Sequence, residues 1–375
     1  MNNMQENRLT FHTFNALRFF AFLRIFLLHL PTGEDSQFYK LISNGGGIGV
    51  DFFFVLSGFL ITYLLTFEKL VSGTINGVNY FLRRSLRIWP LFFTGIAIAY
   101  VNNYISAKFH FGSSAGYSPH IFFSVSFLEN YQMIIHNNFP NGAPLRVFWS
   151  LCVEEHFYLL WFLVFKVVSL KNMPKIFSIL WMGGIVYRIW FYIQFPQKNY
   201  YDIDLMSKLD YFCAGSFIGW LIAYQPILFK KVINSVSAGW RNGFTFFALL
   251  FFYFYQFSGM KRVDDLYFPI ISALIFAILV GLVATSSTFI YFSERNIFSK
   301  LGKISYGLYV FHTVVILSLV TLANFAGVNL TNAAGYFIIG LLSLAFTIAV
   351  SMLSYQYLES PFLRLKKKFR SVPMP

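Results

Sequence analysis

Residues 304–358 read ISYGLYVFHTVVILSLVTLANFAGVNLTNAAGYFIIGLLSLAFTIAVSMLSYQYL and contain no Asp, Glu, Lys or Arg. A helix needs about 20 apolar residues to cross the hydrocarbon core of a bilayer, so this run is long enough for two spanning helices. The sequence Gly327-Val328-Asn329 predicts the turn between them. This run alone indicates an integral membrane protein.

The composition of the whole chain supports the same class. Of 375 residues, 57% are hydrophobic and 12% are charged, and Phe occurs 49 times. Ordinary globular chains contain about 45–50% apolar and about 25% charged residues. A chain this apolar cannot cover a water-facing surface, which excludes soluble enzymes, disordered regulators and fibrous proteins. Cys152 and Cys213 show no metal or redox spacing, and we expect no metal site.

Eight further apolar runs mark additional spans. They lie near residues 13–31, 46–68, 88–107, 147–169, 176–195, 211–229, 242–260 and 266–293. The alternation of a closed β-barrel is absent, so the backbone must satisfy its polar groups within helices. The sequence therefore predicts an all-α polytopic membrane protein with about ten transmembrane helices.

The distribution of basic residues predicts the orientation of these helices. The net charge is +14, and an N-terminus inside the cell places nineteen Lys and Arg in cytoplasmic segments and seven in outer segments. Such an excess marks the cytoplasmic side, so we expect both termini to be cytoplasmic and no nucleic-acid partner. The weak point is the long outer segment 106–146: if its apolar stretch 121–135 spans the membrane, the orientation of every later helix reverses.

The predicted organisation is one membrane domain with short flanks. Residues 1–12 form a cytoplasmic N-terminal segment, residues 13–362 the membrane domain, and residues 363–375 a basic cytoplasmic tail. We expect that tail to contact anionic lipid. The sequence does not indicate an oligomeric state.

Ionisable side chains at membrane depth are costly, so each one is a candidate for function. Arg18 and His29 lie eleven positions apart in the first span. On an α-helix this spacing puts both on one face, about 16 Å apart along the axis. An imidazole can take a proton from a hydroxyl at neutral pH, so His29 is a candidate general base. The alternative is an interfacial His and an Arg that extends to the headgroups.

The glycine-rich run 45–59, GGGIGVDFFFVLSGF, enters the second span. Asp51 lies about one turn into that helix, at the same membrane end as His29, and Ser57 lies deeper. Asp51 is either a site residue or a cap of its helix. Small residues such as Ser57 and Gly58 are also ordinary in helix packing within membranes.

The run 83–90, RRSLRIWP, lies at the cytoplasmic mouth of the third span. If these residues only marked the cytoplasmic side of the membrane, Lys would serve as well as Arg. Guanidinium groups bind phosphates bidentately, so the spacing of Arg83, Arg84 and Arg87 favours a phosphate-binding role.

The run 148–158, FWSLCVEEHFY, enters the fourth span from outside. Adjacent carboxylates at such an entry are expensive unless they are used, although a hydrated interfacial pair is the alternative. Glu154 and Tyr158 share a helix face. A carboxylate here could orient His29 and stabilise its imidazolium.

In the last long run, His312 is isolated among apolar residues, and either a site role or a simple hydrogen bond to a neighbouring helix explains it.

Six segments follow one another in a specific order. They are Arg18 to His29, the run 49–59, Arg83–Pro90, Trp149–Tyr158, Ile304–His312 and Tyr357–Pro361. Each is weak alone, but together they resemble the acyltransferase-3 family of integral membrane acyltransferases over residues 12–365. Two positions depart from the family pattern: Cys152 stands where Ser is common, and His156 where Gln is common.

The resemblance implies transfer of an acyl group, usually acetyl, from cytoplasmic acetyl-coenzyme A to a hydroxyl of a cell-surface saccharide. It places the family's first-helix Arg and His on Arg18 and His29. The expected site residues fall into three groups. They are the catalytic residues His29, Glu154 and Arg18; the acyl-coenzyme A ligands Arg83, Arg84, Arg87, Ser57 and Tyr306; and the further candidates Asp51, Ser150, Glu155, Tyr158 and His312.

The expected mechanism assigns one role to each catalytic residue. His29 deprotonates the acceptor or briefly carries the acyl group. Glu154 orients His29, and Arg18 steadies the donor or an oxyanion. The expected location is the inner membrane of a bacterium, and the outer segment 106–146 is the candidate for acceptor contact by its length and side.

Two alternatives remain open at the level of sequence. A transporter or flippase that performs no chemistry would also use intramembrane Arg, His and Glu, although the inverted repeats typical of transporters are absent. The acceptor could also be a lipid, a small metabolite or another molecule that is not a carbohydrate.

Overall fold

The computed structural model describes residues 11–31, 45–109, 116–198, 202–255, 266–328 and 333–369. Within these ranges the regular secondary structure is helical, and the β-type pairing consists of one isolated bridge between Tyr117 and Pro140. The prediction of an all-α fold is confirmed.

Each of the ten predicted spans contains a helix. These helices are α2 (Thr13–His29), α4 (Ile48–Ser72), α5 (Gly77–Phe109), α8 (Trp149–Val167), α9 (Met173–Gln194), α10 (Leu209–Tyr224), α12 (Ala238–Phe254), α13 (Phe268–Ala284), α15 (Ser305–Phe325) and α16 (Ala333–Ser354). The turn predicted after α15 contains Gly327, whose positive φ of 67° suits glycine. Asn329 lies outside the described residues.

Length and hydropathy select a smaller number of helices as membrane spans. Among the described residues five helical segments are long and apolar enough, namely Ile48–Ser72, Gly77–Ile105, Leu170–Gln194, Ser305–Phe325 and Gly335–Lys366. A sixth arises if α10 and α11 (Pro226–Ser235), which are bent by 110°, count as one broken span. The chain is therefore a multi-pass helical membrane protein. The count of ten spans and the cytoplasmic position of the termini stay predictions.

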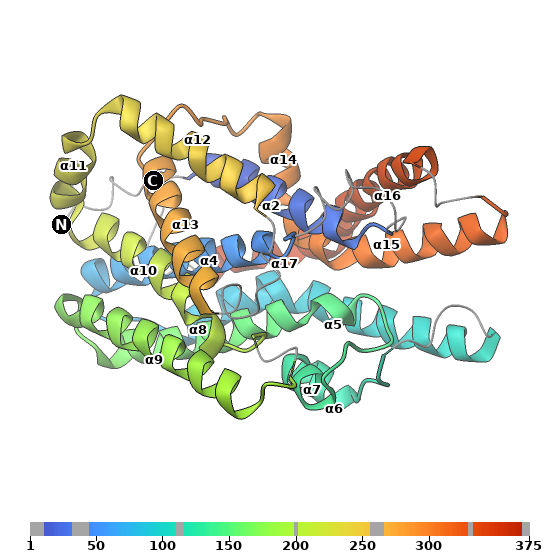
Figure 1. Ribbon diagram of the computed structural model, residues 1–375. Coiled ribbons are helices and arrows are strands. Elements are labelled where there is room, and N and C mark those ends of the chain that lie inside the picture. Colours follow the sequence, from blue (N-terminus) through green and yellow to red (C-terminus); the bar gives the residue numbers. More distant parts are fainter. Residues whose placement is uncertain are drawn as a thin grey trace.

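The helices pack around α4. Figure 1 shows α2 and α4 (blue) in the middle of the bundle, with α12 and α13 (yellow to orange) on one side and α5, α8 and α9 (cyan to green) on the other. The short helices α14 (Ile297–Lys303) and α17 (Ser360–Lys366) complete the bundle beside α2 and α5.

The closest helix pair is α4 with α10, and glycine makes this contact possible. A side chain at Gly215 would collide with the carbonyl of Val55, and one at Gly219 with the carbonyl of Phe59. Gly58 of α4 meets the backbone of Phe212 in the same way. Small residues four apart let helix backbones approach closely in membranes. Gly58 therefore has a packing role that suffices to explain it.

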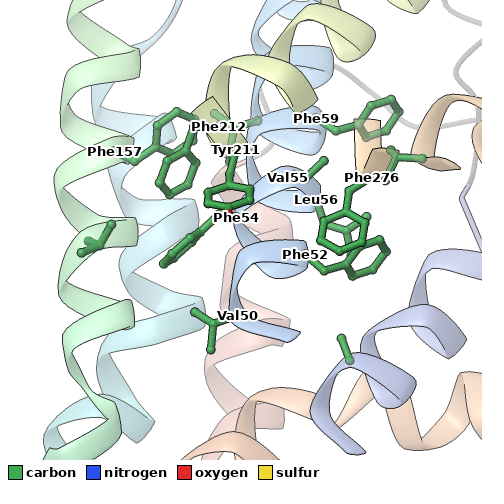
Figure 2. Packing of buried hydrophobic residues seen from close by; sticks show 14 of the residues in the cluster. Val50, Phe52, Phe54, Val55, Leu56, Phe59, Phe157, Tyr211, Phe212 and Phe276 are labelled. Carbon is green, nitrogen blue, oxygen red and sulfur yellow. The ribbon is translucent and has the colours of Figure 1, made fainter. Parts of the chain in front are cut away.

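Aromatic side chains fill the space around this helix pair. Phe212 stacks on Phe157 with ring centroids 4.0 Å apart and lies against Phe54 at 4.8 Å. On the other face of α4, Phe52 meets Phe276 edge to face at 5.3 Å (Figure 2). Such pairs add to the burial of apolar area. They fix α8, α10 and α13 against the helix that carries Ser57.

Residues 116–148 contain the two short helices α6 (Ile121–Val125) and α7 (Glu129–His136), and neither is long enough to cross a bilayer. The bridge between Tyr117 and Pro140 joins the two ends of this segment. The stretch 121–135 therefore returns to the side on which it started. It does not reverse the orientation of the helices that follow.

This segment is a hairpin that lies along α5. Its ends are level with Asn103, whose amide donates to Asn141 Oδ1 at 3.0 Å. At its tip the ring of Phe127 stacks on Phe92 with centroids 4.2 Å apart. Asn103 and Phe92 are eleven residues apart on one helix, which corresponds to about 16 Å. The hairpin thus extends far along α5, toward the start of that helix.

Candidate active site

A pocket opens between α2, α4, α5, α8 and α15. It brings together eight of the predicted site residues, namely Arg18, Ser57, Arg84, Arg87, Ser150, Glu154, Tyr158 and Tyr306. These positions are separated by up to 288 residues in the sequence. The cavity has a volume of about 100 Å³, so it is narrow. The remaining lining is mostly apolar, as in other small-molecule sites.

One end of the pocket is strongly cationic. Arg84 and Arg87 enter from the first half of α5, and Arg18 enters from α2. Arg18 Nη1 donates to Asn15 Oδ1 at 3.1 Å, and the guanidinium of Arg84 lies over the ring of Tyr158 at 5.6 Å. Within the described parts of the chain, none of the ion pairs involves these three arginines. Unpaired guanidinium groups that converge on one space suit an anion.

Glu154 lines the pocket and is held through both carboxylate oxygens. Ser57 Oγ donates to Oε1 at 2.7 Å, and the hydroxyl of Tyr158 donates to Oε2 at 3.1 Å. Arg18 and Arg87 lie within electrostatic range of this carboxylate. Glu154 is thus a nearby countercharge for two of the three pocket arginines.

Two tyrosines of α15 close the pocket on another side. The hydroxyl of Tyr306 donates to the carbonyl of Ile88 at 2.9 Å. This carbonyl belongs to the turn before Pro90, where the ring of proline disturbs the helix ladder. The hydroxyl of Tyr309 donates to the carbonyl of Val147 at 2.9 Å and lies 2.6 Å from Ser150 Oγ. These bonds connect α15 to α5 and α8.

His29 and His312 form a contacting pair beyond the Tyr309 end of the pocket. His312 Nδ1 lies 2.7 Å from the carbonyl of Tyr309, and His312 Nε2 lies 3.3 Å from His29 Nδ1. His29 Nδ1 is also 2.9 Å from the carbonyl of Ile25. A carbonyl can only accept, so both Nδ1 atoms carry the proton in the neutral rings. This tautomer leaves His29 Nε2 with a free lone pair.

The structure gives His29 a different neighbour from the one expected. The carboxylate of Glu154 is bonded to Ser57 and Tyr158, and the imidazole of His29 contacts His312. The expectation that Glu154 orients His29 is therefore wrong in this conformation. The reason is depth: Glu154 lies one helical turn further into α8 than Ser150, which already contacts Tyr309.

Arg83 points away from the pocket. Its Nη2 pairs with Glu68 Oε2 at 2.8 Å, and its Nη1 donates to the carbonyl of Phe369 at 2.9 Å. Glu68 Oε1 also accepts from the backbone amide of Asn76 at 3.1 Å. The expected grouping of Arg83 with Arg84 and Arg87 is therefore wrong in position, because Glu68 and the carbonyl of Phe369 hold the Arg83 guanidinium outside the pocket.

Two other candidate carboxylates also lie outside the pocket lining. Asp51 accepts from Lys208 Nζ at 3.3 Å, and both side chains are buried, each only 9% exposed. The same ammonium lies over the ring of Trp149 at 5.8 Å. Glu155 Oε1 is buried and has no hydrogen-bond partner among the described residues. Asp51 thus forms an ion pair. From the sequence, only a site residue or a helix cap was predicted at this position.

Three residues that shape the site were not among those predicted from the sequence. Tyr309 lies in the segment Ile304–His312, three positions before His312, and this spacing puts both on one helix face. Asn15 lies three positions before Arg18 and shares its face for the same reason. Lys208 gave no comparable signal, because its partner Asp51 is distant in the sequence.

Comparison with known proteins identifies relatives along most of the chain. A family model described as "Acyltransferase domain" matches residues 11–354. The peptidoglycan O-acetyltransferase OatA of Listeria monocytogenes is 27% identical over 336 residues, which are 85% of this chain and 51% of that protein. A putative O-acetyltransferase of Staphylococcus aureus is 26% identical over 371 residues, 93% of this chain and 56% of that protein.

A third relative matches this chain over a similar length. The putative peptidoglycan O-acetyltransferase YrhL of Bacillus subtilis is 26% identical over 369 residues, 92% of this chain and 54% of that protein. The chain spans about half the length of the curated relatives that it matches. No solved structure matches it. The extent of the family match, together with the order of motifs from Arg18 to Pro361, shows that this chain belongs to the acyltransferase-3 family of membrane acyltransferases.

Proposed function

We propose that the protein is an O-acyltransferase of the cell membrane that moves an acetyl group from acetyl-coenzyme A to a hydroxyl of a cell-wall saccharide. One observation carries this proposal above the others. The narrow pocket has unpaired arginines at one end, and His29 lies with a free imidazole nitrogen beyond its other end. Such a site can hold a phosphorylated donor and activate a hydroxyl.

The cationic end suits the phosphates of the donor. Arg84 and Arg87 precede the centre of α5, on the side that the basic residues predict to be cytoplasmic. Coenzyme A thioesters are made in the cytoplasm, carry phosphates at one end and present the thioester on a linear pantetheine arm. A cavity of about 100 Å³ suits a narrow, linear arm of this kind.

The imidazole end suits proton transfer. His29 Nε2 would take the proton of the acceptor hydroxyl while the hydroxyl oxygen attacks the thioester carbonyl. The tetrahedral intermediate then collapses with breakage of the C–S bond, and the leaving thiolate takes the proton from the imidazolium. The Nδ1–H of His29 is shared between the carbonyl of Ile25 and His312 Nε2 throughout, and both acceptors stabilise the positive ring. A route in which His29 Nε2 itself carries the acyl group uses the same nitrogen.

The positions of Arg18 and Glu154 favour donor binding over direct participation. Arg18 lies eleven residues before His29 on α2, about 16 Å away along the axis, which is too far to reach an oxyanion beside that ring. Glu154 lies within electrostatic range of Arg18 and Arg87. We assign Arg18 to the donor and Glu154 to the orientation of the arginines.

The acceptor is assigned from the relatives and from the side of the membrane. OatA and YrhL carry peptidoglycan in their names, which makes a peptidoglycan sugar the first acceptor to test. The hairpin 116–148 begins and ends on the outer side by the predicted topology and is the segment most suited to guide a large acceptor. The predicted location is the inner membrane of a bacterium.

An acetyl-transfer assay in membranes tests the proposal. Membranes that contain the intact protein or the His29→Ala variant receive radiolabelled acetyl-coenzyme A, and label is counted in the saccharide fraction. We expect label only with the intact protein, at equal amounts of folded protein. Near-normal transfer by His29→Ala would overturn the assignment of the base. No transfer with either protein would favour another donor, or a transporter without chemistry.

A further inference from the structure

The C-terminal helix α17 and the turn after it, η6 (Lys367–Phe369), are fastened to the cationic end of the pocket. Arg83 of α5 donates to the carbonyl of Phe369 at 2.9 Å and pairs with Glu68 at 2.8 Å. Glu68 is buried, with 7% of its side chain exposed. These contacts hold residues 360–369 in a fixed position relative to Arg84 and Arg87.

This position brings a further cation to the arginines. Lys366, the last residue of α17, lies within electrostatic range of Arg18, Arg84 and Arg87 and is half-buried. Lys368, two positions later, is exposed. The two lysines of one basic segment thus have different surroundings. An anchor to lipid would favour outward-facing cations of equal exposure.

The charges in this cluster do not balance. Among the described residues no ion pair involves Lys366, Arg18, Arg84 or Arg87. These four cations face three carboxylates, because Glu154 lines the pocket and Glu155 and Glu359 lie within electrostatic range of Arg84 and Arg87, respectively. Like charges that converge at low exposure repel each other, and a cation without a partner is costly to bury. A ligand with several negative charges would relieve this cost.

We propose that Lys366 binds a phosphate of the acyl-coenzyme A donor, and that this phosphate is the one on the 3′ position of the ribose. The proposal rests on the proposed function. Arg84 and Arg87 line the pocket and are placed for the diphosphate next to the pantetheine arm, whereas Lys366 is near these arginines but is not among the lining residues. The phosphate furthest from the thioester is the 3′-phosphate. Lys366 would then distinguish donors with and without it.

The test compares two donors and three variants. Initial rates are measured with acetyl-coenzyme A and with acetyl-3′-dephospho-coenzyme A for the intact protein, Lys366→Gln, Lys366→Arg and the exposed control Lys368→Gln. We expect Lys366→Gln to raise KM for acetyl-coenzyme A about tenfold with kcat unchanged, the loss expected for one charge-assisted hydrogen bond. Lys366→Arg should restore most of the affinity, and Lys368→Gln should match the intact protein. With the dephospho donor, Lys366→Gln and the intact protein should have the same KM.

Three results would overturn the proposal. They are an unchanged KM in Lys366→Gln, an equal increase with both donors, and an intact protein that does not distinguish the donors. The assay is run in phosphatidylcholine vesicles with and without phosphatidylglycerol. An effect that requires the anionic lipid and ignores the donor would assign Lys366 to a lipid headgroup instead.

A binding measurement separates this proposal from the proposed function. Coenzyme A and 3′-dephospho-coenzyme A are titrated into the purified full chain, with no acceptor present. If the protein transfers no acetyl group but binds coenzyme A through Lys366, the phosphate site stands and the proposed reaction falls. If transfer occurs and Lys366→Gln binds both nucleotides as the intact protein does, the reaction stands and this inference falls. If coenzyme A does not bind, both fall.

Discussion

His29 of α2 and His312 of α15 are joined ring to ring, with His29 Nδ1 3.3 Å from His312 Nε2. The rings lie nearly perpendicular, with centroids 4.9 Å apart. His312 is completely buried, and His29 is half-buried. The buried ring of His312 therefore holds the ring of His29, which is the one that can meet a substrate. Nε2 of His29 stays available for chemistry.

Replacing His312 should slow transfer without abolishing it. Loss of a hydrogen bond to a charged group costs about 1.5–3 kcal/mol, which corresponds to about 10- to 100-fold in kcat. We expect this loss for His312→Leu and a smaller one for His312→Gln, whose amide oxygen can accept from His29 Nδ1–H. KM for the donor should change little. Equal kcat for His312→Leu and the intact protein would show that the contact has no role in the reaction.

Two neighbouring arginines should behave differently. Arg87→Ala should raise KM for acetyl-coenzyme A about tenfold, because a charge-assisted hydrogen bond to phosphate is lost. Arg83→Ala should lower the thermal midpoint, because it breaks the pair with the buried Glu68. Glu68→Ala is the matched control and should reproduce the Arg83→Ala midpoint. If Arg83→Ala leaves the thermal midpoint unchanged and raises KM for acetyl-coenzyme A, Arg83 binds the donor after all.

The hairpin along α5 should lose stability as the pH rises. Glu129 is fully buried and accepts from the hydroxyls of Tyr117 and Ser124, each at 2.6 Å. Burial raises the pKa of Glu129 above 4.5, although both hydroxyls oppose the shift. A raised pKa in the folded state favours the neutral acid, so its stabilisation is complete below about pH 4.5 and is lost as the pH rises through the folded value.

Glu129→Gln tests this dependence, because glutamine has the shape of the neutral acid and does not ionise. Limited proteolysis of the hairpin between pH 4.5 and 8 is the measurement. The intact protein should become easier to cleave as the pH rises, and Glu129→Gln should change less. The same pH dependence in both proteins would assign it to other groups.

The contact between α4 and α10 should tolerate no added side chain. Gly215→Val places a branched side chain against the carbonyl of Val55. Overpacking typically costs about 1–3 kcal/mol and occasionally more. We expect a lower thermal midpoint and less folded protein in membranes. Gly183, where a side chain would meet nothing within 4 Å, is the control position, and Gly183→Ala should be neutral. A stable Gly215→Val protein would show that the two helices can separate.

Apolar runs predicted the helices because backbone N–H and C=O groups inside a membrane must hydrogen-bond to one another, and a helix does this within one segment. The charge-free run 304–358 predicted α15 and α16 with their turn at Gly327, and eight further apolar runs predicted the other eight of the ten long helices. The hairpin 116–148 was harder to predict. Its course depends on the stacking of Phe127 on Phe92, a contact between segments that periodicity does not describe.

The residue types of the site were predictable, but their partners were not. Polar groups in apolar runs stand out, which selected Arg18, Glu154 and His312. Which groups meet depends on helix rotation and depth. Arg83 pairs with Glu68, a distant carboxylate that the spacing of the arginines does not indicate, whereas Arg84 lines the pocket. A difference of one turn gave His29 the partner His312 in place of Glu154.

The account requires the acetyl group to pass from the arginine end of the pocket to His29, and hence across the membrane. Inverted vesicles that enclose a peptidoglycan saccharide expose the predicted cytoplasmic face to radiolabelled acetyl-coenzyme A added outside. We predict that label accumulates on the enclosed saccharide with the intact protein and is absent with His29→Ala. Label that appears only on saccharide added outside, on the same side as the donor, would contradict the account.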